Sequence, residues 1–505
     1  MSANLYDLFL ERAPRLDKLA IDAPEGMSLT YGALFERASA AARALADLGV
    51  EPGDRVAVQI DKSPDMIALA LACLKAGAAL LPLNPAYTLA ELEYFLADAG
   101  PALTICRPAS LAAVQGLAAG LGSKAVESLG ARREGTFAAL IAAASPDFAT
   151  VPRAADDLAA LLYTSGTTGR SKGAMLTHDN LASNASALAD LWRFSADDAL
   201  IHALPLFHTH GLFVAVNVAL LAGATLIFQP RFEADAVVAA LPRATALMGV
   251  PTFYTRLLDH PGLTREATAH VRLFVSGSAP LLEETHRRWR EKTGHAILER
   301  YGMTETGMIA SNPYEGERRP GAVGFALPGV SLRAADPDTG APLARGAVGV
   351  VEVKGPNVFK GYWRMPEKTA AEFRPDGFFV TGDLGRIDAD GYLHIVGRAK
   401  DLVISGGLNV YPKEVEAEID AIPGVAESAA IGVPHPDFGE AVVAVVALAP
   451  GATLSEAETL AALEGRLARY KTPKRVIFVD ALPRNAMGKV EKAALRETHK
   501  GIYGG

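Results

Sequence analysis

The sequence predicts an α/β fold with a large N-terminal domain and a small, mobile α+β C-terminal domain. Three observations predict it. Apolar strand-like runs alternate with amphipathic helix-like runs through most of the chain, short strands between Gly, Pro and Asp turns begin near residue 320, and a second strand–helix series begins near residue 401. The first pattern is typical of parallel-sheet subdomains covered by helices, and the second of a small β-barrel-like subdomain.

The early elements alternate regularly. Residues 30–49 have the pattern of an Ala-rich amphipathic helix, and residues 65–77 that of a helix ending at Gly77. Strands are expected at 55–60 and 78–83, and the alternation recurs in 199–207, 217–228 and 244–250.

The later elements are shorter and divide the chain. Strands are expected within 322–335, 347–354 and 392–396, then helices over 412–421 and 454–470 and strands over 425–433 and 441–448. We place the boundary near Arg398–Asp401, which gives domains of residues 1–399 and 400–505. The tail over 496–505 is expected to be disordered or on the surface.

Composition and charge exclude several classes of protein. The chain has 505 residues, a net charge of -8 and 50% hydrophobic residues. No basic patch suggests nucleic acid or an anionic membrane. The apolar runs, such as 441–449, are shorter than the roughly 20 residues that span a bilayer, and the N-terminus lacks the order of a signal peptide. Cys73 and Cys106 form neither a disulfide framework nor a metal motif, so we expect buried thiols in a cytoplasmic enzyme.

The segment from Tyr163 to Leu176, YTSGTTGRSKGAML, is the strongest local signal. Its glycines allow backbone N–H groups to approach an anion closely, its hydroxyls add donors, and Lys172 adds positive charge. The spacing differs from the G-x-x-x-x-G-K-[ST] of a Walker A loop. We interpret the segment as a phosphate-binding loop of another kind.

This segment closely resembles the phosphate-binding signature of the adenylate-forming superfamily, which includes acyl-CoA synthetases, luciferases and peptide-synthetase adenylation domains. The resemblance continues in the family's order along nearly the whole chain. The further motifs are Tyr301–Gly307 (YGMTETG), Thr381–Leu384 (TGDL), Gly397–Pro412 (GRAKDLVISGGLNVYP) and Pro483–Lys489 (PRNAMGK). Each motif alone would be weak, but five in register are specific.

The resemblance implies a ligase that uses ATP, Mg²⁺ and coenzyme A. A carboxylate attacks the α-phosphorus of ATP, pyrophosphate leaves, and the acyl group then passes to the CoA thiol. Positive charge near the α-phosphate stabilises that transition state. The implied catalytic residues are Lys489, Thr304 and Glu305, with Glu305 and Thr168 at the metal.

The resemblance also assigns the nucleotide site. The implied ATP- and AMP-binding residues are Thr164, Ser165, Gly166, Thr167, Thr168, Gly169, Lys172, Ser278, Ala279, Pro280, Glu299, Arg300, Tyr301, Gly302, Met303, Asp383 and Arg398. Asp383 would accept hydrogen bonds from the ribose hydroxyls. For Arg300, a structural role beside Tyr301 is favoured over a contact with the acid substrate.

Two further implied features concern the second half-reaction. Lys400 matches the family's hinge, about which the C-terminal domain rotates so that the CoA thiol replaces Lys489 at the acyl carbonyl. Ser405, Gly406 and Gly407 would then line the tunnel for the pantetheine arm. Because Lys489 lies in a segment similar to those acetylated in acyl-CoA synthetases, an acetyltransferase and a deacetylase are possible partners.

The acid substrate is expected to be a small dicarboxylate. Arg256 follows the turn GVPTFYT at the family's acyl pocket, and a buried guanidinium needs an anion, such as a second substrate carboxylate. His208 and Ser278 would add donors. The phrases GVPTFYTRLL, VSGSAPLL and ILERYGMTET resemble malonate–CoA ligases, which favours malonate, with methylmalonate tolerated.

Several alternatives stay open from the sequence. Arg256 could point outward and pair with a surface acid such as Asp259, and His208 could be a pocket wall without substrate contact. The protein could activate another short or aryl acid, or load a free-standing carrier protein. A catalytically silent nucleotide-binding protein is disfavoured because Lys172, Glu305, Asp383 and Lys489 are intact.

Overall fold

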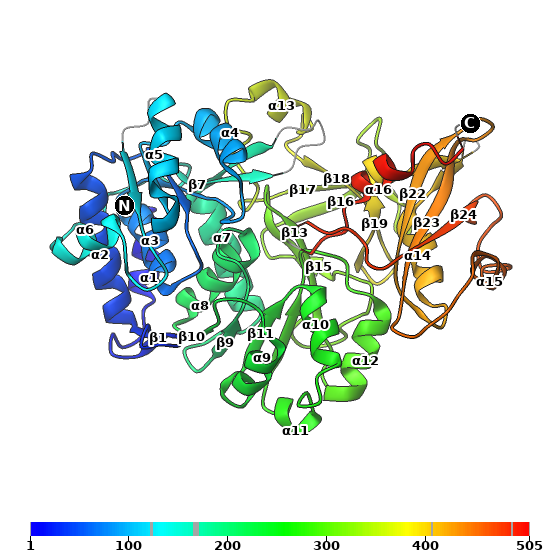
Figure 1. Cartoon of the computed structure of the whole chain (residues 1–505), viewed down its shortest axis with the longest axis horizontal. Coiled ribbons are helices and arrows are strands. Elements are labelled where there is room, and N and C mark those ends of the chain that lie inside the picture. The colour runs from blue at the N-terminus through cyan, green and yellow to red at the C-terminus, as the bar shows by residue number, and fades with distance from the viewer. Residues whose placement is uncertain (1, 122–124, 165–170, 406–407, 486–487, 504–505) are drawn as a thin grey trace.

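The structure contains two helix-covered sheets, a small antiparallel sheet and a C-terminal unit (Figure 1). The structure is a computed structural model, which describes residues 2–121, 125–164, 171–405, 408–485 and 488–503. None of the described helices is both long and apolar enough to cross a bilayer.

The first sheet has six strands in the order β6-β5-β3-β4-β7-β8. All neighbours are parallel except β7 and β8, which form an antiparallel pair. The strands are β3 (Arg55–Gln59), β4 (Ala79–Pro82), β5 (Leu103–Cys106), β6 (Ala125–Ser128), β7 (Leu158–Thr164) and β8 (Lys172–Thr177). The helices of this part are α2 (Tyr31–Asp47), α3 (Pro64–Lys75), α4 (Leu89–Ala99), α5 (Leu111–Gly120) and α6 (Thr136–Ala143).

The second sheet has nine strands in the order β15-β14-β13-β12-β11-β9-β10-β1-β2, and its central pairs are parallel. The strands are β1 (Leu19–Asp22), β2 (Leu29–Thr30), β9 (Ala199–His202), β10 (Thr225–Phe228), β11 (Ala246–Gly249), β12 (Leu273–Ser276), β13 (Leu298–Met303), β14 (Gly307–Ser311) and β15 (Phe325–Ala326). The helices are α1 (Leu5–Glu11), α7 (His178–Leu191), α8 (Asn217–Ala222), α9 (Ala234–Ala240), α10 (Pro251–Leu258), α11 (Arg265–Thr268) and α12 (Glu283–Thr293).

The small subdomain is an antiparallel sheet in the order β16-β17-β18-β19, and Leu393 of β19 forms a further antiparallel bridge with Gly324. It comprises β16 (Ser331–Ala335), β17 (Gly349–Lys354), β18 (Phe379–Ile387) and β19 (Leu393–Arg398), with α13 (Pro366–Ala371) between β17 and β18. The short 3-10 turn η4 (Ala399–Asp401) follows β19 directly. The predicted hinge Lys400 lies in this turn.

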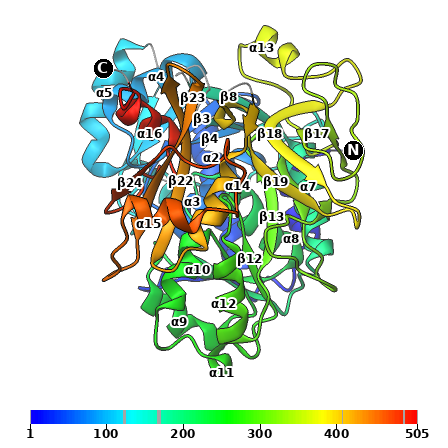
Figure 2. The same cartoon turned by 90° about the vertical axis from the view of Figure 1, so that its right-hand side faces the viewer.

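The C-terminal unit faces the viewer in Figure 2. Its sheet runs β21-β20-β23-β22, and β24 pairs in parallel with β23. The elements are β20 (Val403–Ser405), β21 (Leu408–Val410), α14 (Pro412–Asp420), β22 (Val425–His435), β23 (Gly439–Leu448), α15 (Glu456–Ala462), β24 (Arg475–Val479) and α16 (Lys492–His499). The mixed α+β composition agrees with the prediction.

One local prediction was wrong. The helix expected over 454–470 begins with a capping box at Ser455 but ends at Ala462, and Gly465 then takes a left-handed φ of 75° that an α-helix does not contain. The described part of the tail lies on the surface, one of the two forms expected, and it is helical through His499 because Leu495 of α16 is buried in an apolar cluster of the C-terminal unit. Cys73 and Cys106 are buried free thiols, as expected.

Asp420 at the end of α14 should make the stability of the C-terminal unit depend on pH. Ser428 Oγ donates to its carboxylate over 2.7 Å, but burial, with Glu416 and Glu427 nearby, raises the pKa of Asp420 to about 7. A carboxyl whose pKa is higher in the folded state stabilises the fold at low pH and loses that contribution as pH rises towards 7.

The isosteric change Asp420→Asn is therefore expected to raise the Tm of the protein at pH 8 and to change it little at pH 4. Thermal unfolding at the two pH values measures this difference. Asp437→Asn, on an exposed turn of the same unit, serves as the control. Equal shifts of Tm at both pH values would contradict the explanation.

Candidate active site

The predicted phosphate-binding loop connects β7 to β8, and the structure describes the residues at its two ends. Thr164 ends β7, and its Oγ1 donates to Glu305 Oε1 over 3.4 Å. Lys172 begins β8 with its ammonium buried, 3.2 Å from Glu372 Oε1 and 4.0 Å from the centre of the Tyr362 ring. The predicted residues Ser165, Gly166, Thr167, Thr168 and Gly169 lie outside the described residues.

Thr304 and Glu305 occupy the turn between β13 and β14, opposite the ends of that loop. Glu305 is buried and accepts a hydrogen bond from Tyr362 Oη over 3.0 Å. Burial raises the pKa of Glu305, which indicates a carboxylate that needs a cation. It fits Mg²⁺. Among the described residues no group of three or more His, Cys, Asp or Glu could hold a metal, so phosphate oxygens and water would complete its coordination.

Asp383 ties three strands together beside the hinge. It lies on β18, its Oδ2 accepts from Tyr301 Oη of β13 over 2.5 Å, and its Oδ1 lies 2.8 Å from Nε of Arg398 on β19. Burial and the neighbouring carboxylate raise the pKa of Tyr301, so the phenol stays protonated and donates. An ionised carboxylate has about four acceptor positions, so Asp383 could still accept from two ribose hydroxyls.

Glu299, Gly302 and Met303 belong to the same strand, β13. Glu299 is buried, and its Oε1 lies 3.2 Å from His286 Nδ1 and accepts from the Gly321 N–H over 3.2 Å. Gly302 packs so closely that a Cβ there would lie 2.1 Å from the carbonyl oxygen of Gly307. These residues shape the strand that carries Thr304 and Glu305.

The loop with Ser278, Ala279 and Pro280 follows β12. Ser278 adopts a left-handed φ of 70°, a strained conformation for a residue other than glycine. Its Oγ lies 3.2 Å from His210 Nδ1, a hydrogen bond whose direction depends on the imidazole tautomer. The strained turn brings Ser278 towards the histidines.

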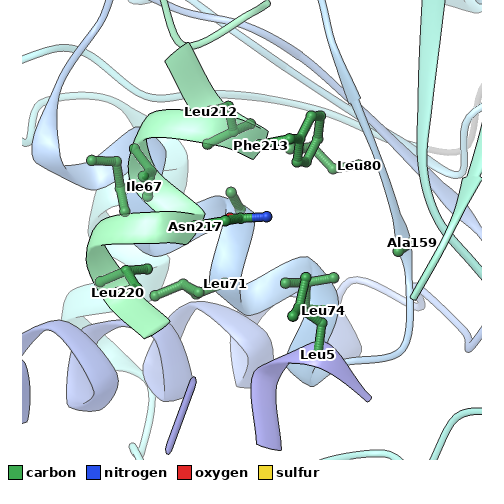
Figure 3. Close-up of a pocket in the computed structure, with 12 residues that line it drawn as sticks. Leu5, Ile67, Leu71, Leu74, Leu80, Ala159, Leu212, Phe213, Asn217 and Leu220 are labelled. Atoms are coloured by element: carbon green, nitrogen blue, oxygen red, sulfur yellow. The ribbon is translucent and has the colours of Figure 1, made fainter. Parts of the chain in front are cut away.

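A π-helix, His210–Val216, begins at the second of the two histidines His208 and His210 and continues into α8. Gly211 is required at its start, since a Cβ there would lie 2.0 Å from the Pro205 carbonyl oxygen. Figure 3 shows Asn217 among apolar side chains beside this segment, around a cavity of about 20 Å³ that could hold one water molecule. Such wide turns are common at functional sites.

Arg300 is the unusual residue of the site. It is only 4% exposed, and its Nε and one terminal nitrogen are buried with no acceptor among the described residues. Its guanidinium lies against Gly277, where a Cβ would be 2.3 Å from Cζ. Burial lowers the pKa of Arg300 to about 9. Burial and the nearby charge of Arg300 lower the pKa of His208 to about 4. The cation therefore faces neutral imidazoles.

Arg256 does not occupy the buried position that we predicted. It lies on α10, whose buried residues are Tyr254, Leu257 and Leu258, and its own side chain is exposed. The position is two residues after Tyr254, so the helical twist turns Arg256 away from the sheet. The proposed surface partner Asp259 instead lies 3.8 Å from Arg288. The buried cation near the histidines is Arg300, which the sequence had suggested was structural.

Lys489 enters this site from the C-terminal unit. Burial lowers the pKa of Lys489 to about 8, and its charged neighbours are Arg398, Asp383, Asp401 and Lys400. A Cβ on the preceding Gly488 would lie 3.6 Å from Thr252 Oγ1, so the loop rests on the first turn of α10. In this structure the C-terminal unit is therefore docked, with Lys489 beside Asp383, the predicted ribose-binding residue. Of the predicted tunnel residues, Ser405 is buried, and Gly406 and Gly407 lie outside the described residues.

A cavity of about 510 Å³ adjoins the site. It lies beyond the carboxyl ends of β3, β4, β9 and β10, where ligands commonly bind in open α/β sheets. Its walls are mainly apolar and include Phe207, next to His208, and Phe253. Arg107 and Arg231 also line it.

The fold and these positions can be compared with known proteins. Residues 10–363 match the model of the AMP-binding enzyme family, and residues 414–489 match the AMP-binding enzyme C-terminal domain. The chain belongs to the AMP-binding enzyme family. Over the full length of both chains it is 60% identical to MatB from Rhodopseudomonas palustris, with a TM-score of 0.98 to the ATP-bound structure and 0.87 to the apo structure.

Curated relatives are more distant but cover most of the chain. A feruloyl-CoA synthase of an Amycolatopsis species is 39% identical over 93% of this chain and 94% of its own length. The mitochondrial malonate–CoA ligase ACSF3 of Mus musculus is 36% identical over 92% of this chain and 86% of its own. The family therefore includes CoA ligases for different acids.

The sequence missed two residues of the site, Tyr362 and Glu372. Tyr362 contacts Lys172 and Glu305, and its Oη donates to Glu372 over 2.6 Å. These residues lie in the segment between β17 and β18, far along the chain from the phosphate loop. The sequence shows only a tyrosine and a glutamate close to α13. Such residues are common on protein surfaces, so no sequence motif identifies these two as part of the site.

Replacing Lys489 should separate two half-reactions. Lys489→Ala is expected to abolish acyl-adenylate formation, because the cation beside the α-phosphate is lost, and to slow thioester formation from a supplied acyl-adenylate much less. Acid-dependent ATP–pyrophosphate exchange and thioester release measure the two steps. Lys500→Ala, at an exposed lysine, should leave both unchanged. Equal loss of both steps in Lys489→Ala would contradict this role.

Proposed function

We propose that the protein is an ATP-dependent malonate–CoA ligase that also accepts methylmalonate. It would form malonyl-AMP and pyrophosphate and then transfer the malonyl group to CoA. The observation that carries the proposal is the buried guanidinium of Arg300, two nitrogens of which have no acceptor among the described residues, beside His208 and His210.

A buried cation without a partner is costly, since its desolvation is not repaid by an ion pair. Burial also lowers the pKa of His210, so the nearest side chains are neutral bases and not carboxylates. A second carboxylate on the acid substrate would supply the missing charge and could accept two parallel hydrogen bonds. A monocarboxylic or aryl acid would leave Arg300 unpaired. This favours malonate over the aryl acids of relatives such as feruloyl-CoA synthase.

In the first step, Lys172 and the ends of the phosphate loop would hold the β- and γ-phosphates, and Asp383 would hold the ribose. Thr304 would contact the α-phosphate. Lys489 would stand between the α-phosphate and the attacking carboxylate and stabilise the developing charge. Glu305 would hold Mg²⁺, which neutralises phosphate charge when bound.

In the second step, the CoA thiol must reach the acyl carbonyl. The 510 Å³ cavity shares Phe207 and Phe253 with the acyl end of the site, which supports it as the approach for the pantetheine arm. Arg107 and Arg231 at its wall would meet the CoA phosphates. Rotation about Lys400 would remove Lys489 and bring Ser405 and the adjoining glycines to this route.

We further propose a cytoplasmic location, and reversible acetylation of Lys489 by an acetyltransferase and a deacetylase. Acetylation would remove the charge that the first step requires. Mass spectrometry of the protein from its native cells tests this proposal, and an unmodified Lys489 under all growth conditions would contradict it.

The acid specificity tests Arg300 directly. Wild-type protein should form AMP in the presence of CoA most rapidly with malonate, then methylmalonate, and poorly with acetate, butyrate, benzoate and ferulate. Arg300→Met should lower kcat/KM for malonate by about 30-fold or more, because losing a buried charge partner costs roughly 2–5 kcal/mol. Its activity with butyrate should fall much less.

Arg256→Met is the matched control and should stay within about twofold of wild type, because Arg256 is exposed. ATP-dependent stabilisation against heat shows whether Arg300→Met still folds and binds nucleotide. Preference of the wild type for butyrate or ferulate would refute the malonate proposal and leave the ligase assignment intact. Turnover only with a carrier protein in place of CoA would favour the adenylation-enzyme alternative.

A further inference from the structure

A lysine on α14 joins the C-terminal unit to the rest of the protein. Lys413, in the first turn of that helix, donates from Nζ to the Ile395 carbonyl oxygen on β19 over 3.0 Å. Among the described side chains, no ion pair joins residues 2–399 to residues 400–503. This charge-assisted hydrogen bond therefore crosses a boundary that is otherwise poor in electrostatic links.

Carboxylates on both sides of the boundary face Lys413. They are Glu299 of β13 and Glu283 of α12 on the N-terminal side, and Glu416 on its own helix. Glu416 is already 2.5 Å from Lys492. Glu299 is buried, and its neighbours include His286 and Lys413. Attraction between Lys413 and Glu299 therefore favours the docked position.

The docked position is the one in which Lys489 can act. Lys489 is next to Asp383 and Arg398, while Gly488 rests on Thr252. Lys413 lies 13 residues after the predicted hinge, so rotation about Lys400 would carry α14 away from β19 and Glu299. The bond that stabilises the docked state must then break.

We propose that Lys413 is a positioning residue for the adenylation step, which holds the C-terminal unit against Ile395 and Glu299 so that Lys489 stays in the active site. The inference deepens the proposed function and depends on it for the identity of the two half-reactions. Lys413 touches no substrate in this arrangement and acts only through Lys489.

Lys413→Met keeps the length of the side chain and removes its charge. It should slow malonate-dependent ATP–pyrophosphate exchange by about 10- to 100-fold, the range expected for losing a hydrogen bond from a charged group. Thioester formation from supplied malonyl-AMP should stay within about twofold of wild type. Lys413→Arg, which can still donate to Ile395, should recover most of the exchange activity.

Arg466→Met is the matched control. Arg466 pairs over 2.8 Å with Glu418, which lies on α14 as Lys413 does. Both partners of this pair belong to the C-terminal unit. In Arg466→Met the rates of the two half-reactions should keep the wild-type ratio. A merely structural contribution of α14 would lower both half-reactions together in either variant.

A second measurement needs no substrate. Acetic anhydride labels accessible lysines, and Lys489 should be labelled several-fold faster in Lys413→Met than in wild type, as followed by mass spectrometry. Unchanged labelling of Lys489, or equal loss of the two half-reactions, would overturn the proposal. If the wild type catalyses no ATP–pyrophosphate exchange with malonate but does so with another acid, the proposed substrate is wrong. The ratio of the two half-reactions measured with that acid still tests the role of Lys413.

Discussion

The carboxylate of Asp383 is the interaction on which the active site depends. It accepts a hydrogen bond from Tyr301 of β13 and pairs with Arg398 at the end of β19. These bonds fix the small antiparallel sheet against the large one immediately before the predicted hinge at Lys400. They also place negative charge beside Lys489 of the C-terminal unit. One buried acid thus joins three strands and helps to position the lysine that we propose for the first step.

Burial without pairing separates the binding side chains of this site from the structural ones. Asp198, for example, is buried but fully engaged by Arg272 and Thr245, so its charge serves the fold. Arg300 is equally buried and has no such partner among the described residues. Because the folded protein bears the cost of a desolvated cation, a ligand that supplies the anion gains the corresponding stabilisation.

The docking of the C-terminal unit relates these buried charges to the order of the two proposed half-reactions. In the proposed mechanism Lys489 acts while the α-phosphate is being attacked and would obstruct the thiol afterwards. An attachment made of a few polar contacts near the hinge suits that requirement, since it can hold one position and still release it. The higher TM-score to the ATP-bound MatB structure than to the apo structure is consistent with a docked arrangement.

The sequence alone determined the α/β class, most elements and the nucleotide-binding motifs, because periodicity and local glycine chemistry are encoded in neighbouring residues. Helix 30–49 and strands 55–60 and 78–83 appear as α2, β3 and β4. Only the tertiary structure showed which arginine is buried beside the histidines. Arg256 and Arg300 both follow apolar runs near family motifs, but helical twist turns the first towards solvent, and the pleat of β13 and packing on Gly277 bury the second. Burial and pairing depend on segments far apart in the chain, so local patterns do not reveal them.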